Sequence, residues 1–77
     1  MIDPDSPVPL YRQVVNLIQE QIKSGELAPD RPVPSAARLV QEHGIARGTA
    51  LKAIRMLVDE GFAYVVAGKG TYVKRKD

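Results

Sequence analysis

The side chains best suited to chemistry in this chain lie between residues 47 and 55. This stretch opens with Arg47, Gly48 and Thr49, and Lys52 and Arg55 follow one helical turn later. A guanidinium can bind the edge of guanine, and a threonine offers a hydroxyl to phosphate or a methyl to thymine. Gly48 has no side chain, which lets the backbone come close to a ligand. The set indicates contact with double-stranded DNA, with Lys52 and Arg55 on flanking phosphates, although each cation alone is equally consistent with a solvated helix.

A second candidate is Lys69, which stands between Gly68 and Gly70. The flanking segments 62–66 and 71–74 are rich in β-branched and aromatic residues, as strands are, and the glycines between them predict a hairpin turn. A lysine at the tip of such a hairpin can reach phosphate or the minor groove. Without the preceding residues, a turn lysine that faces water would be the simpler interpretation.

The positive charge is unevenly distributed along the chain, whose net charge is only +2. Residues 47–77 hold seven basic and three acidic side chains, whereas residues 1–46 hold four basic and six acidic ones. This asymmetry favours a localised surface for a polyanion. We expect residues 75–77 to form a basic tail, which more often stays solvated than binds DNA.

Three helices are expected to position these side chains, over residues 9–24, 35–43 and 47–59. Ser35 is predicted to cap the second helix, and Gly44 to end it. The apolar residues that recur at helical spacing, and that we expect in the core, are Leu10, Val14, Leu17, Ile18, Ile22, Ala36, Leu39, Val40, Ala50, Ala53, Ile54, Leu57 and Val58.

The order of three helices and a hairpin predicts an α+β fold of the winged helix-turn-helix type. In a helix-turn-helix the second helix lies in the major groove, and its first residues meet the base edges. The hairpin is then the wing. We predict a flexible arm at residues 1–8 and a winged helix-turn-helix domain at residues 9–74.

The chain resembles the N-terminal DNA-binding domain of GntR-family bacterial transcription regulators over nearly its whole length. The matching segments are PLYRQVVNLIQEQIKSGEL at 9–27, PSAARLVQEHGIARGTALKAIRMLVDEGF at 34–62 and GKGTYV at 68–73. The resemblance implies sequence-specific DNA binding by a transcription regulator, most often a repressor. It carries DNA contacts over to Arg47, Thr49 and the wing.

The chain departs from the family pattern at three positions on the expected DNA-binding surface. Ala37 stands where the family usually has a DNA-contacting arginine, although Ser35 and the adjacent Arg38 remain candidate DNA-binding residues. Ala46 stands where serine or threonine is frequent, and Leu51 stands where a basic residue is frequent. In the loop after the first helix, Asp30 and Pro32 occupy positions where the family commonly has glycine and a polar residue.

Other classes of function are less consistent with the sequence. A protein-interaction module is the main alternative, and Ala37 and Leu51 give it some support. RNA binding is weaker, because aromatic residues for base stacking on an open sheet are lacking. An enzyme is least expected: there is no cysteine, His43 is the single histidine, and no catalytic triad, carboxylate pair or phosphate-binding loop is visible. We expect no metal and no cofactor.

The expected partner is a palindromic DNA operator, read by a protein in the cytoplasm. The absence of cysteine fits a reducing compartment, and no apolar run approaches the roughly 20 residues that cross a bilayer, so we expect no membrane contact. Tyr11 and Leu51 are the bulky residues without an expected place in the core, which predicts a monomer in solution. A dimer on DNA, or through a further C-terminal segment, is left open. Family members usually carry a C-terminal effector-binding or dimerisation domain, and whether this chain belongs to a longer regulator is left open.

Overall fold

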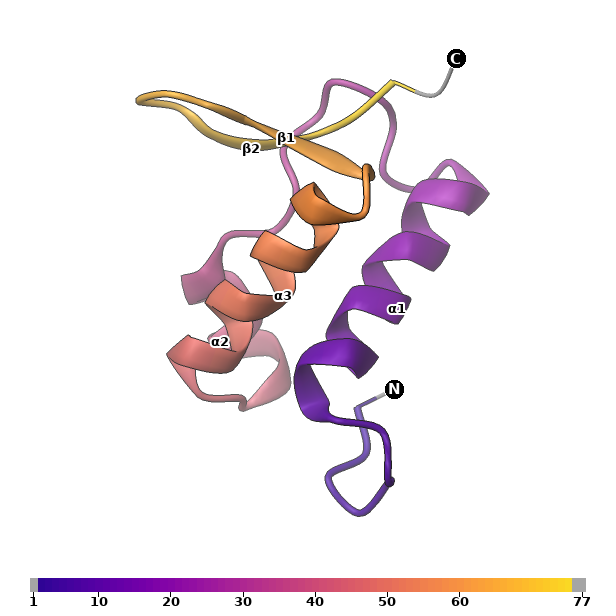
Figure 1. Ribbon diagram of the computed structural model, residues 1–77, viewed down its shortest axis with the longest axis vertical. Coiled ribbons are helices and arrows are strands. Elements are labelled where there is room, and N and C mark those ends of the chain that lie inside the picture. Colours follow the sequence, from indigo (N-terminus) through magenta and orange to yellow (C-terminus); the bar gives the residue numbers. More distant parts are fainter. Residues whose placement is uncertain (1, 76–77) are drawn as a thin grey trace.

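The computed structural model describes residues 2–75 as three helices followed by a two-stranded antiparallel hairpin (Figure 1). The elements are α1 (Leu10–Ser24), α2 (Ala36–His43), α3 (Arg47–Asp59), β1 (Ala63–Val66) and β2 (Gly70–Val73). The predicted order and fold class are confirmed. The ends of the elements differ from the predicted ones by no more than one residue. No helix among the residues described is both long and apolar enough to cross a membrane.

The helix ends follow local signals in the sequence. The Ser35 hydroxyl caps α2 by accepting a hydrogen bond from the backbone N–H of Arg38 at 3.1 Å. Gly25 and Gly44 end α1 and α2 in the left-handed conformation, with φ of 88° and 65°. Glycine adopts this conformation without the steric penalty that other residues incur. The predicted cap at Ser35 and the predicted stop at Gly44 are therefore confirmed.

The core forms where α3 packs against both α1 and α2 (Figure 1). Along α3, the buried residues Ala50, Ala53 and Leu57 are 0% exposed. The two alanines add little volume, so the neighbouring helices approach the α3 backbone closely. The fully buried side chains that face this seam include Val14, Val15, Ile18 and Leu39.

The buried face of α1 is rotated slightly from the predicted one. Val15 is 0% exposed although its position was not among the expected core residues, whereas Leu10 and Leu17 are only half-buried. Val14, Val15 and Ile18 form a stripe at spacings of one and four residues, which centres the contact with α3 between them. Leu10 and Leu17 consequently lie at the margins of that stripe.

The hairpin is attached to the helices at its open end. Ala63 pairs with Val73 there, and both are buried, at 3% and 0% exposure. The loop before α2 covers the outer edge of β2, because the N–H of Val33 bonds to the carbonyl of Thr71 at 3.0 Å and the N–H of Val73 bonds to the carbonyl of Arg31 at 2.8 Å. Unpaired edge groups of the sheet are thereby reduced.

Polar contacts join the start of α1 to both the N-terminal segment and the end of α3. The Gln13 amide bonds to the main chain of Asp3 and Val8, at distances between 2.6 and 2.8 Å. The Arg12 guanidinium makes two hydrogen bonds to the Glu60 carboxylate, at 3.1 and 2.5 Å. Residues 2–8 thus fold back onto α1, and the flexibility of the arm stays a prediction.

Truncating a core residue of α3 is expected to destabilise the fold. Leu57→Ala removes a side chain that is 0% exposed, and such changes cost about 2–5 kcal/mol through lost burial and the cavity left behind. Chemical denaturation measures this loss. Leu51→Ala is the matched control on the same helix: its side chain is 48% exposed, so we expect a change below about 0.5 kcal/mol. Equal effects of the two variants would contradict this description of the core.

Candidate DNA-binding face

The exposed side of α3 presents a row of three side chains one helical turn apart. Residues four positions apart lie on the same helix face, which aligns Arg47, Leu51 and Arg55 along one side of α3. All three are exposed. Within residues 2–75, neither arginine has an ion-pair partner. Their guanidinium donors are therefore available to a ligand.

The first turn of α3 is left open on this same face. Ala46 occupies the cap position and makes no side-chain hydrogen bond, and the turn contains no acidic residue. The backbone N–H groups at a helix start carry partial positive charge and bind phosphate well. Serine or threonine at this position would offer a hydroxyl to those N–H groups, so Ala46 leaves them accessible.

Gly48 lies in this open turn, and the fold does not require a glycine there. Its φ is not positive, and a Cβ at this position would have no heavy atom within 4 Å. Glycine inside a helix costs up to about 1 kcal/mol relative to alanine. The missing side chain thus leaves space outside the protein surface. Thr49, the next residue, is half-buried beside it.

Lys52 is directed away from the arginine row. Its ammonium nitrogen lies 4.1 Å from the centroid of the Tyr11 ring on α1, a geometry that stabilises a cation over an aromatic face. Lys52 thus has an intramolecular partner, which neither Arg47 nor Arg55 has among the ion pairs of residues 2–75. The role of Tyr11 in positioning Lys52 was not predicted from the sequence. The sequence feature that pointed to this role is an aromatic side chain without a place in the expected core.

Ser35 and Arg38 mark the start of α2, and both are engaged within the protein. The Ser35 hydroxyl serves as the helix cap. The Arg38 Nε donates to Glu42 at 2.9 Å, in a pair whose side chains are 64% and 46% exposed. Exposed pairs of this kind contribute little to stability. Arg38 can therefore exchange Glu42 for a phosphate at small cost.

The hairpin tip carries Lys69 on a tight turn. The Lys69 N–H bonds to the carbonyl of Val66 at 3.0 Å, and the glycines on either side, Gly68 and Gly70, have φ of 77° and 132°. In the view of Figure 1 the tip projects to the side of α3 on which α2 lies, away from α1. Lys69 is exposed at this tip. The wing thus extends the surface formed by α2 and α3.

A carboxylate in the loop before α2 anchors the wing. Asp30 accepts hydrogen bonds from the Tyr64 hydroxyl at 2.9 Å and from Arg75 at 3.0 Å. These bonds, with that of Tyr64 the larger influence, hold the pKa of Asp30 below its usual value. Asp30 has φ of 65°, a left-handed conformation that is unusual for a residue with a side chain. This network was not predicted from the sequence. The sequence feature that pointed to it is an aspartate at a position where glycine is common in the family.

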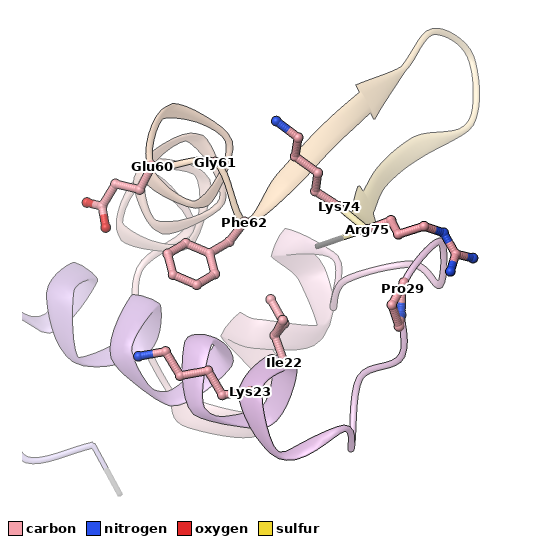
Figure 2. A pocket seen from close by; sticks show the side chains of 8 residues that line it. All are labelled: Ile22, Lys23, Pro29, Glu60, Gly61, Phe62, Lys74 and Arg75. Carbon is pink, nitrogen blue, oxygen red and sulfur yellow. The ribbon is translucent and has the colours of Figure 1, made fainter. Parts of the chain in front are cut away.

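A hollow of about 500 Å³ lies between the ends of α1 and α3 and the loop before α2 (Figure 2). Ile22 and Phe62 line it, and the charged ends of Lys74 and Arg75 point away from each other. No three histidine, aspartate or glutamate side chains in the described part of the chain come together as metal ligands would. The hollow lacks convergent polar groups, so the open face of α3 is the better candidate site. Of the predicted tail, residues 76 and 77 lie outside the described part.

Comparison with known proteins identifies this architecture. Residues 10–73 match the family described as bacterial regulatory proteins, gntR family. The chain belongs to the GntR family. It is 42% identical to the transcriptional repressor NagR of Bacillus subtilis over 96% of its own length, and 43% identical to the repressor MngR of Escherichia coli over 88%. It spans 30% and 28% of those relatives, respectively.

Solved structures of GntR-family proteins share the fold. YtrA from Sulfolobus acidocaldarius, a GntR-family transcription factor, superimposes with a TM-score of 0.84 and 39% identity, over 100% of this chain and 65% of YtrA. The DNA-binding domain of AraR in complex with operator ORR3 gives a TM-score of 0.81 and 37% identity, over 95% of this chain and 88% of that one. The predicted family, winged-helix fold and class of DNA-binding transcription regulator are confirmed, while the individual contact residues stay predictions.

Removing the Tyr64 hydroxyl is expected to weaken the anchor of this GntR-family wing. In Tyr64→Phe the pKa of Asp30 should rise toward its usual value, and the melting temperature should fall. Because the pKa of Asp30 is lowered in the folded state, its stabilising contribution is present above about pH 4 and is lost as the pH falls further. The difference in melting temperature between wild type and variant should therefore shrink in acid.

NMR titration of the Asp30 carboxyl, with melting curves across this pH range, measures both effects. Tyr72→Phe is the matched control, because Tyr72 stacks on Tyr64 with ring centroids 6.0 Å apart without contacting Asp30 through its hydroxyl. An Asp30 pKa that moves equally in both variants would rule out the hydrogen bond as its cause.

Proposed function

We propose that residues 9–74 are the operator-reading domain of a bacterial repressor that acts in the cytoplasm. The observation that carries this proposal is the open face of α3, on which Arg47 and Arg55 have no partner within residues 2–75 and the helix start has no side-chain cap. Cationic side chains beside free N–H groups complement DNA phosphates and base edges. The repressor names of NagR and MngR, and the operator bound to AraR, support the same proposal.

The proposal assigns a role in DNA binding to each candidate residue. Arg47 enters the major groove and binds a guanine edge, and Thr49 contacts the adjacent backbone or a thymine methyl. Gly48 lets a DNA strand approach the first turn of α3 closely. Lys69 contacts phosphate or the minor groove from the wing, between Gly68 and Gly70. Flanking phosphates are bound by the remaining candidates, namely Ser35, Arg38, Lys52 and Arg55.

The alternative of a protein-docking face rests on the exposed Leu51, at 48% exposure. Selection of bound sequences from a random duplex pool, followed by affinity measurements over a range of salt, separates the two functions. Binding to DNA releases counterions, so its affinity falls linearly with salt on logarithmic axes. The repressor proposal fails if no duplex from the pool is retained at low salt.

Arg47→Ala is expected to weaken binding to the selected site by about 1–3 kcal/mol and to relax base preference at one position in each half-site. The reason is that a bidentate contact to guanine both stabilises the complex and discriminates among bases. Affinities for the site and its single-base variants measure the effect.

Lys69→Ala is the comparison for this prediction, because Lys69 is proposed to contact phosphate rather than a base. It should weaken specific and random DNA similarly and flatten the salt dependence by about one unit. Unchanged base preference in Arg47→Ala would contradict the role in base recognition. If the slope of log affinity against log salt is unchanged in Lys69→Ala, this lysine faces water in the turn and does not contact phosphate.

We further propose that the domain is a monomer that reads one half of a palindrome. The large apolar side chains exposed among residues 2–75 are Val8, Leu51 and Val65, which lie on three different segments. A stable dimer needs roughly 800 Å² from each partner. Sedimentation of the 77-residue chain without DNA, at tens of micromolar protein, should therefore give a single monomeric species. A predominant dimer would contradict this proposal.

A further inference from the structure

Leu51 is an apolar side chain in the middle of a cationic surface. It is 48% exposed, and its neighbours one turn away on the same helix face are Arg47 and Arg55. The other large apolar residues exposed within residues 2–75, Val8 and Val65, lie outside the helices. Among the helices of residues 2–75, Leu51 is thus the large apolar residue that is exposed.

Leu51 is not part of the hydrophobic core. The partly buried apolar side chains that pack against the core include Ile54 and Val58 of the same helix, but they do not include Leu51. Half of its apolar surface therefore remains in water, and burying it against a partner would be favourable. Since both flanking arginines lack partners among the described residues, whatever covers Leu51 also meets two cations.

The major groove of DNA presents one apolar group, the 5-methyl of thymine. The other base edges present hydrogen-bond donors and acceptors, which a leucine would remove from water without pairing. We propose that Leu51 contacts a thymine methyl in the major groove and so selects T·A at one position of each half-site. This inference rests on the proposed operator-reading function and adds a specificity-determining residue to it.

The spacing along α3 predicts where this position lies. Four residues of α-helix span about 6 Å, and base pairs are stacked about 3.4 Å apart. The base pair that Leu51 reads should therefore lie within about two steps of the guanine read by Arg47. Arg55, a further turn along, is proposed to contact the flanking backbone.

Replacement of thymine by uracil tests the contact, because it removes the methyl group and leaves the pairing edge unchanged. The duplex selected from a random pool is prepared with uracil at each thymine in turn, and its affinity is measured for the wild type, Leu51→Ala and Val8→Ala. Val8 is 38% exposed on the N-terminal segment and is the matched control for an exposed apolar truncation. Melting curves of the free proteins establish that the variants remain folded.

For the wild type, uracil at one position of each half-site should weaken binding about fourfold, as expected for one buried methyl group. At that position Leu51→Ala should bind the thymine and uracil duplexes equally, while Val8→Ala should discriminate as the wild type does. A wild type that binds every uracil duplex as tightly as the parent would overturn the inference, and so would Leu51→Ala that keeps the discrimination at every position where the wild type shows it. A wild type that binds no duplex from the pool would overturn the proposed function as well.

Discussion

The seam along Ala50, Ala53 and Leu57 is the contact on which the rest of the molecule depends. These three residues bury one face of α3 completely, against side chains from both other helices. A chain of 77 residues has room for a single thin core. With α3 inside that core along one side, its opposite side can be occupied by residues that contribute nothing to packing. The candidate binding face is thus the side of α3 that the core does not use.

The two ends of α3 differ in the contacts that they make within the protein. At its C-terminal end, Glu60 is bound by Arg12 and Gln19 of α1, and Phe62 leads directly into the hairpin. At its N-terminal end, Ala46 provides no side-chain cap. Stabilising contacts therefore gather where α3 meets the wing, and the helix start stays free for a ligand. The hydrogen bonds from Arg12 also lower the pKa of Glu60 from its usual value.

Local signals made most of the fold predictable from the sequence. The cap at Ser35 and the stop at Gly44 act through neighbouring residues, and each helix end was predicted to within one residue. The contacts that were missed depend on tertiary placement instead. Val15 is buried because of the angle at which α1 meets α3, and neither periodicity nor residue type determines that angle.

The candidate site was predicted less completely for the same reason. Arg47 and Arg55 are exposed as a binding role requires, but their contacts and that of Lys52 stay predictions. Helical spacing did not reveal that the ring of Tyr11 on α1 lies 4.1 Å from the Lys52 ammonium. The anchor at Asp30 joins residues more than thirty positions apart in the sequence, so no local pattern could reveal it.

Residues that neither pack nor pair carry the most information about a partner. Arg38 and Lys52 are charged and exposed, yet each has an intramolecular partner that accounts for its position. The fold offers no comparable explanation for Gly48 and Leu51. Gly48 lowers the stability of the helix, and Leu51 leaves apolar surface in contact with water. Leu51 lies within the row that the two arginines define, and Gly48 lies in the open first turn beside Arg47. Contacts to phosphate attract any DNA, whereas Arg47 on a guanine edge and Leu51 on a thymine methyl would discriminate among sequences. The choice of DNA sequence is therefore better read from the exposed side chains of this row than from the net charge of the surface.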